Sequence, residues 1–308
     1  MVTESAVLSR SETDPLSAHG PAPRDFVVLL KPRVATLVAF TGMVGIVLAN
    51  QALNPVIAVT AILCIAVGAG AAGAINMWYE ADIDALMHRT RNRPLPAGRM
   101  ELGTALGFGV VMAVASVALL GLATNWLAAA LLTLAILFYV FVYTVWLKRR
   151  TPQNIVIGGA AGAIPPMIGW AAATGDLHPL PILLFAIIFM WTPPHFWALS
   201  LYKSDDYQRA VIPMLPVVAG HESTRRHILG YTLLLVPVSL APAILGYTHA
   251  IYAIGAAVLG LVFIALAVIL WRRRSEMLAR RVFAFSVAYL FLIFLLLLVD
   301  NTWRVGSA

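Results

Sequence analysis

The amino-acid sequence predicts an all-α protein, a polytopic bundle of nine transmembrane helices. Of its 308 residues, 61% are hydrophobic and only 11% are charged, whereas an average soluble domain has about 25% charged residues. The hydrophobic residues gather in stretches close to the roughly 20 residues with which a helix crosses the hydrocarbon core of a bilayer. Loops that carry several cations alternate with loops that carry none. These three observations together predict the fold class.

Nine hydrophobic stretches can be counted along the chain. They cover residues 34–50, 55–79, 102–122, 125–147, 153–173, 180–201, 228–247, 249–271 and 281–299. We expect the stretches at 125–147 and 180–201 to be broken or tilted. Residues 1–25 have neither the apolar segment of a signal peptide nor the composition of a transit peptide. The sequence therefore predicts a disordered tail at 1–25, a membrane domain at 26–300 and a short tail at 301–308.

The distribution of Lys and Arg predicts the orientation. All of them except Arg304 lie in the N-terminal tail or in the loops after the second, fourth, sixth and eighth stretches. Because cytoplasmic loops carry an excess of Lys and Arg, we expect a cytoplasmic N-terminus and a C-terminus on the other side. The net charge of +7 thus reflects membrane topology and not nucleic-acid binding. The tail without targeting features favours a bacterial plasma membrane.

The second stretch ends in a polar face with two carboxylates. Asn76, Glu80 and Asp84 are spaced by four residues, so on a helix they project from the same side. Like charges at this spacing destabilise a helix unless they have a partner, and Mg²⁺ takes such oxygen ligands when it carries phosphates. The next loop supplies three possible phosphate ligands: Arg89, Arg91 and Arg93. A second interpretation stays open, in which these acids and arginines merely pair at the membrane surface.

Two further stretches end in polar clusters. The fourth ends in Lys148 and two arginines, which by itself is typical of membrane anchoring. In the sixth, two consecutive prolines predict a break in the helix inside the membrane. At 100° per residue, His195, Tyr202 and Asp206 fall within about 20° of one another on the helix that follows. His195 either faces a substrate or is a hydrogen-bonded core residue.

Several segments resemble the intramembrane prenyltransferases of the UbiA superfamily, and within it the heme O synthases. The resemblance covers roughly residues 25–300. It rests on the face from Asn76 to Asp84 and on three further segments: MHRTRNRPLPAGR, YTVWLKRRTPQNIVIGG and MWTPPHFWALSLYKSDDYQRAVIPMLP. Two departures from the superfamily pattern, Met77 and Glu80 in place of aspartates and a second motif reduced to Asp205 and Asp206, favour the heme O synthases. They leave open whether one or two Mg²⁺ ions bind.

The resemblance implies a bundle around a central cavity and a specific reaction. Its cofactor would be Mg²⁺, bound with a prenyl diphosphate at the cytoplasmic end. The farnesyl group of farnesyl diphosphate would be transferred to the vinyl group of heme b, which would also be hydrated. The products would be diphosphate and heme O, the latter for terminal oxidases. Heme b, farnesyl diphosphate and membrane lipid would be the partners, with heme A synthase or terminal oxidase assembly proteins as further candidates and no nucleic acid.

The resemblance also implies roles for individual residues. Metal-binding and catalytic roles fall to four of them: Asn76, Glu80, Asp84 and Asp206. Diphosphate binding falls to four cations: Arg89, Arg93, Lys148 and Lys203. His195 is a further catalytic candidate, in contact with heme iron or a propionate or as a proton acceptor, and Tyr202 would also contact the acceptor. The cations of the N-terminal tail and of the last basic loop are expected to serve orientation only.

Two other functions are compatible with parts of the sequence. A prenyltransferase could act on an aromatic acceptor, such as a quinone or chlorophyll precursor. A secondary transporter also uses broken helices, but it places polar residues at the membrane midplane and divides into similar halves. Nine stretches with charge at one face do not fit that plan, so the transporter is the more remote alternative.

Overall fold

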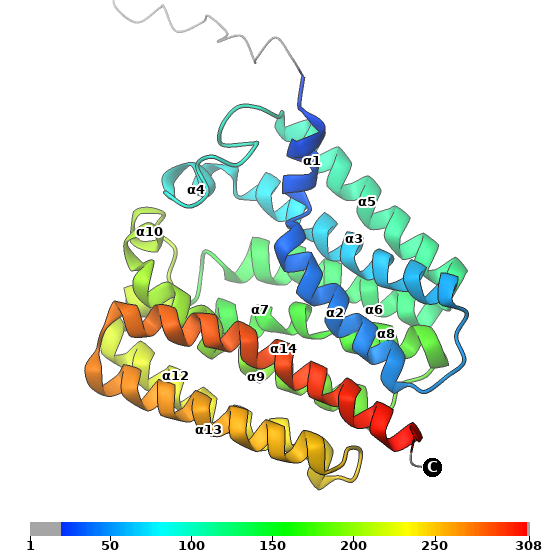
Figure 1. The fold of residues 1–308 in the computed structure, drawn as a ribbon. Coiled ribbons are helices and arrows are strands. Elements are labelled where there is room, and N and C mark those ends of the chain that lie inside the picture. The colour runs from blue at the N-terminus through cyan, green and yellow to red at the C-terminus, as the bar shows by residue number, and fades with distance from the viewer. Residues whose placement is uncertain (1–19, 307–308) are drawn as a thin grey trace, which may run out of the picture.

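Helices make up the whole fold in a computed structural model that describes residues 20–306 (Figure 1); this part of the chain contains no strand. Eight helical segments in it are long and apolar enough to cross a membrane. A bent pair, α1 (Pro23–Leu29) and α2 (Pro32–Leu48), would be the ninth, with an angle of 52° at the break. The predicted all-α transmembrane bundle is confirmed, and the count reaches nine when the bent pair forms one span.

The other helices follow the predicted stretches closely. The spans are α3 (Pro55–Tyr79), α5 (Leu102–Ala123), α6 (Trp126–Leu137) with the π-helix η1 (Phe138–Leu147), α7 (Asn154–Ala163) with α8 (Pro165–Thr174), α9 (Pro179–Tyr202), α12 (Gly220–Ile244), α13 (Ala250–Arg273) and α14 (Glu276–Gly306). Three short helices lie in the loops: α4 (Ala81–Leu86), α10 (Ser204–Arg209) and α11 (Leu215–Val218).

The start of α12 differs from the prediction. This helix begins eight residues before the predicted stretch, because its first turns are polar and hydropathy marks only the apolar part of a helix. At the N-terminus, residues 1–19 of the predicted tail lie outside the described residues, and α1 begins at Pro23. At the other end, α14 continues to Gly306, into the range predicted as a tail.

Of the expectations about helix breaks, one is confirmed and two need correction. Of the two spans expected to be irregular, 125–147 does change, from α-helix to π-helix at Phe138. The predicted break at Pro193 and Pro194 is wrong, since α9 stays helical through both prolines. The chain breaks after Tyr202 instead, so Asp206 lies on α10 and does not share a helix with His195.

Contacts with α14 explain why α9 stays intact at its prolines. Trp191, before the pair, donates its indole N–H to the backbone oxygen of Ser286 at 2.6 Å. His195, after the pair, has its Nδ1 2.7 Å from the Ser286 hydroxyl. Prolines are tolerated in membrane helices where neighbouring helices hold the flanking turns in place. One residue of α14 therefore fixes α9 on both sides of the prolines.

Two large hydrophobic clusters make up most of the core of the described residues. One joins α9, α12, α13 and α14 around fully buried aromatic side chains, among them Trp197, Phe263 and Tyr289. The other joins α3, α5, α6 and α8. Helix α2 contributes to both, with Val44 in the first and Ile46 in the second. Figure 1 shows α2 between the two groups of helices.

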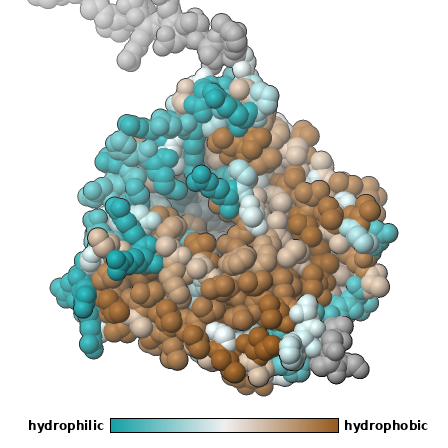
Figure 2. All heavy atoms as spheres, viewed as in Figure 1, coloured by the Kyte–Doolittle hydropathy of each residue, from teal (hydrophilic) through white to brown (hydrophobic). Residues whose placement is uncertain are grey.

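On the face seen in Figure 2, most of the hydrophilic surface gathers on one side. Figure 2 shows hydrophilic residues around a hollow, with a hydrophobic surface beyond it. The hollow lies where Figure 1 places α1, α4, α10 and the start of α14 around a space. An apolar cluster holds two of these elements together, with Ile83 and Met87 beside α4 packed on Tyr207 and Ile212 beside α10. The polar segments around α4 and α10 are therefore packed together at the edge of the hollow.

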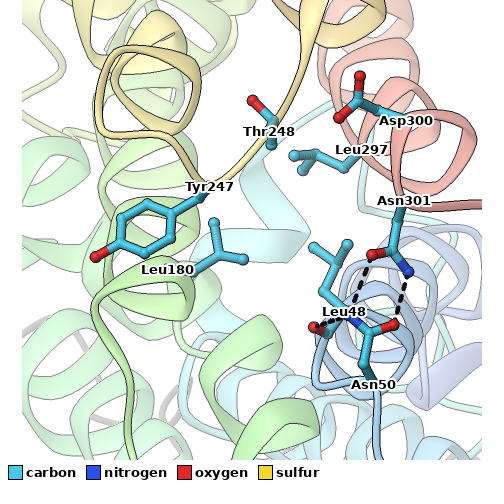
Figure 3. Close-up of a pocket in the computed structure, with 8 residues that line it drawn as sticks. All are labelled: Leu48, Asn50, Leu180, Tyr247, Thr248, Leu297, Asp300 and Asn301. Carbon is cyan, nitrogen blue, oxygen red and sulfur yellow. Dashed lines mark hydrogen bonds between the residues drawn. The ribbon is translucent and has the colours of Figure 1, made fainter. Parts of the chain in front are cut away.

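A small pocket lies at the other end of α2 and α14 (Figure 3). Its lining includes Asn50, Thr248 and Asp300. Asp300 accepts backbone N–H groups from His249 at 2.7 Å and Tyr252 at 3.1 Å. Because this carboxylate satisfies the start of α13, we assign the residues around it a structural role.

The crossing of α2 and α8 generates a test of the fold. A Cβ at Gly169 would collide with the backbone oxygen of Gly42. We expect Gly169→Ala to destabilise the protein by about 1–3 kcal/mol, because backbone cannot move aside as a side chain can. Thermal unfolding in detergent measures the effect. Gly107→Ala is the matched control, since nothing lies within 4 Å of a Cβ there; equal melting temperatures for both variants would contradict the packing.

Candidate active site

The polar face predicted at the end of the second span exists across a helix junction. Asn76 lies in the last turn of α3, Glu80 between α3 and α4, and Asp84 in α4. The backbone N–H of Glu80 donates to the backbone oxygen of Asn76 at 3.0 Å, and the backbone N–H of Asp84 donates to the backbone oxygen of Glu80 at 2.8 Å. The four-residue register is therefore continuous. All three residues are buried, with at most 3% of their surface exposed.

Each residue of this acidic face has a cation as its partner. Lys148 forms an ion pair with Glu80, and Arg93 pairs with Asp84 at 2.6 Å between Nη1 and Oδ2. Lys31 donates from Nζ to Asn76 Oδ1 at 3.1 Å. The three cations come from the end of η1, the loop after α4 and the break between α1 and α2. The fold thus gathers charges from three separate parts of the chain.

Lys31 contacts the acidic face, although the N-terminal cations were expected to serve orientation only. It adopts a left-handed backbone conformation, with φ 49°, between α1 and α2. Its side chain passes Gly73 of α3, where a Cβ would lie 3.2 Å from Lys31 Cδ. In the sequence, only two features relate to this contact: Lys31 directly precedes a proline before the first span, and α3 contains small residues. Neither feature predicts that Lys31 would contact α3.

The π-helix η1 gives the fourth span a role beyond anchoring. Asn76 donates from Nδ2 to the hydroxyl of Thr144 at 3.1 Å, and this hydroxyl donates to the Tyr139 backbone oxygen at 2.9 Å. The backbone N–H of Lys148 bonds five residues back, to Tyr143, at 2.9 Å. The Lys148 ammonium lies 5.7 Å from the centre of the Tyr143 ring. The π turn therefore sets the position from which Lys148 reaches Glu80.

Asp82 lies apart from the acidic face, as its position on the helix predicts. Arg149 donates to its two carboxylate oxygens at 2.8 and 3.0 Å. Partial burial raises the pKa of Asp82, but the hydrogen bonds from Arg149, backbone hydrogen bonds and the charge of Arg149 together hold this pKa below its usual value. The 64% exposure of the Asp82 side chain makes this a surface pair.

The second acidic motif lies against the loop after α4. Asp206 is buried, pairs with Arg209 and accepts the backbone N–H of His88 at 3.3 Å. Within residues 20–306, no three His, Cys, Asp or Glu side chains lie close enough to share a metal ion. A metal ligand role for Asp206 would therefore be separate from Glu80 and Asp84. Arg89 and Lys203 make no side-chain hydrogen bond or ion pair with the described residues, which leaves both available to an anion.

One oxygen of the acidic face lacks a partner. Glu80 Oε1 is fully buried and accepts no hydrogen bond from the described part of the chain. A buried carboxylate oxygen without a donor is costly, and a divalent cation would supply what it lacks. Two carboxylates and one amide also leave coordination positions for water and phosphate, as Mg²⁺ requires. Asn76, Glu80 and Asp84 thus fit a magnesium site.

His195 and Tyr202 belong to a different cluster. The His195 ring stacks between Trp191 and Phe283, and the ring of Tyr202 meets Phe283 edge-on at 6.1 Å. Arg280, from the last basic loop, lies 5.3 Å from the centre of the Tyr202 ring. No hydrogen bond or ion pair joins His195 or Tyr202 to the acidic face within residues 20–306.

Comparison with known proteins places this architecture. The profile of the UbiA prenyltransferase family matches residues 38–299. A protoheme IX farnesyltransferase from Parvibaculum lavamentivorans is 58% identical over 92% of this chain and 91% of its own. The structure of a digeranylgeranylglyceryl phosphate synthase has a TM-score of 0.75 at 17% identity, over 90% of this chain and 97% of its own.

A second solved structure carries ligands. It is a UbiA homologue from Archaeoglobus fulgidus bound to GPP and Mg²⁺, with a TM-score of 0.61 and 16% identity over 89% of this chain and 99% of its own. At these identities both structures show the shared fold alone, whereas the profile covers most of the sequence. The chain therefore belongs to the UbiA prenyltransferase family.

Proposed function

We propose that this protein transfers the farnesyl group of farnesyl diphosphate to the vinyl group of heme b, and that water then adds to the resulting carbocation, producing heme O and diphosphate. The observation that carries the proposal is the 58% identity, over nearly the full length of both chains, to a protoheme IX farnesyltransferase. The acidic face and its cations support a reaction that begins with a diphosphate.

The site residues divide into two proposed groups. Asn76, Glu80 and Asp84 would hold Mg²⁺, and Asp206 would be a separate ligand; when bound, the ion neutralises charge on the diphosphate. The Mg²⁺ and GPP in the archaeal homologue support this group. The diphosphate would be bound by five cations: Lys31, Arg89, Arg93, Lys148 and Lys203.

The arrangement suits the ionisation of an allylic diphosphate. Negative charge develops on the leaving diphosphate, and cations already in position stabilise it without reorganisation. Arg93, Lys148 and Lys31 are in position because the acidic face holds them. The allylic cation that remains has to be kept from water, which an apolar interior does.

We further propose a place in the cell. The protein is an integral membrane protein with several spans, and the named relative is bacterial. We place it in a bacterial plasma membrane with the N-terminus and the site at the cytoplasmic face, because the cations of the site lie in the loops that the positive-inside rule assigns to that face. Heme A synthase or terminal oxidase assembly proteins remain candidate partners.

The direct test is product formation. Purified protein in detergent is incubated with heme b, farnesyl diphosphate and Mg²⁺, and the porphyrin product is analysed by mass spectrometry. We expect the mass of heme O. No product with heme, but a prenylated product with a 4-hydroxybenzoate-type acceptor, would contradict the heme assignment and favour the aromatic-acceptor alternative.

The acidic face generates a second prediction. Glu80→Gln and Asp84→Asn keep the shape of each side chain but remove its charge, so we expect kcat/KM to fall by about 10²-fold or more in each. Asp82→Asn is the matched control on the same short helix, because its exposed carboxylate pairs only with Arg149; we expect less than a twofold change. Full activity in both acidic-face variants would mean that these residues form only a surface ion-pair cluster.

Lys31 generates a third prediction. Lys31→Met removes the ammonium that contacts Asn76, and we expect kcat/KM for farnesyl diphosphate to fall by about tenfold or more. Arg33→Met is the control, because Arg33 lies two residues away and is exposed. Its kcat/KM should stay near that of the unmodified protein. Steady-state kinetics measure both. Equal activities would restore the view that the N-terminal cations only orient the chain.

A further inference from the structure

The hydrogen bonds of Ser286 determine which nitrogen of His195 carries the proton. The Ser286 hydroxyl donates to the backbone oxygen of Phe283 at 2.6 Å. A hydroxyl has a single hydrogen, so toward His195 Nδ1, at 2.7 Å, it can act only as an acceptor. His195 is therefore the donor, with its proton on Nδ1. Its Nε2 carries a free lone pair.

The surroundings hold the imidazole in one orientation. Trp191 and Phe283 stack on its two faces, with ring centres 4.3 and 4.6 Å away and planes inclined by 19° and 24°. Phe196 meets it edge-on at 5.2 Å. With both faces covered and Nδ1 engaged, Nε2 is the polar atom that remains available to a ligand.

Nε2 is unpaired without being sealed off. It makes no hydrogen bond to the described residues, and it is not among the fully buried polar atoms that lack a partner there. His195 as a whole keeps 9% of its surface exposed. Nε2 is therefore not fully enclosed by the described residues.

The chemistry of this position favours metal ligation over proton uptake. The groups around the ring are Trp191, Phe196, Phe283 and Ser286, and no carboxylate contacts it within residues 20–306. None of these groups is negatively charged, so no ion pair there stabilises an imidazolium. A neutral imidazole whose second nitrogen donates a hydrogen bond is the form in which histidine binds transition metals.

We infer that His195 Nε2 coordinates the iron of the heme substrate, and that Ser286 is a positioning residue that fixes the ligating tautomer. The inference rests on the proposed function, and it explains how the acceptor site selects an iron porphyrin. A free-base porphyrin or a simple aromatic acceptor offers no metal to Nε2. The two residues thus set acceptor specificity.

The test compares heme with the same porphyrin without iron. The full chain in detergent is titrated with ferric heme b and with protoporphyrin IX, and binding is followed by the Soret absorbance and by tryptophan fluorescence. We expect His195→Ala to lose the imidazole-type heme spectrum and to bind heme at least about tenfold more weakly. Its affinity for protoporphyrin IX should not change.

Ser286 is tested in the same way. Ser286→Ala keeps the backbone oxygen that accepts from Trp191. It removes the hydroxyl that holds the His195 proton on Nδ1. We expect heme affinity to fall by about tenfold with protoporphyrin IX affinity unchanged, and Ser286→Thr to restore much of the loss. Ser239→Ala is the matched control, a buried serine hydroxyl that Tyr289 contacts at 2.8 Å and that does not touch His195.

Three results would overturn the inference. If wild-type protein farnesylates heme but His195→Ala keeps the spectrum and affinity of the heme complex, His195 is not the ligand. If His195→Ala weakens both porphyrins equally, its role is packing. If wild-type protein binds neither porphyrin and forms no farnesylated heme, the proposed function fails first and the inference with it.

Discussion

The site depends on charge compensation at the end of α3. Two carboxylates and an amide are buried there, and buried charges require partners. The chain provides them from three distant segments, with Lys31, Arg93 and Lys148 meeting Asn76, Asp84 and Glu80. The acidic face therefore organises its own surroundings. The break between α1 and α2, the loop after α4 and the end of η1 are all held to the same small region.

Irregular helices, more than regular ones, place the side chains that matter. The left-handed residue between α1 and α2 brings Lys31 to the site, and the junction at Glu80 separates α3 from α4 without changing their register. The proline pair of α9, in contrast, does not interrupt its helix, because Ser286 of α14 holds the helix on both sides of the pair. Local sequence marks these places, but contacts with other helices determine their outcome.

Much of the fold could be predicted because hydrophobic length and cation spacing are properties of the local sequence. The face formed by Asn76, Glu80 and Asp84 could be predicted for the same reason, since helical spacing alone brings them together. The contribution of Lys31 could not, because it depends on a contact with α3, 45 residues away. The bond between His195 and Ser286 spans 91 residues, and no local pattern encodes it.

The π-helical segment η1 constrains how this region can change in evolution. In its wider turn the backbone N–H of Lys148 bonds to the backbone oxygen of Tyr143, five residues back, and the Lys148 side chain reaches Glu80. Deleting one residue between Tyr143 and Lys148 would leave them four residues apart, the spacing of an α-helical hydrogen bond, and would remove the wide turn. Many substitutions along Phe138–Leu147 would preserve the path of the backbone. A change of length would not, so this segment should vary in sequence far more readily than in residue number.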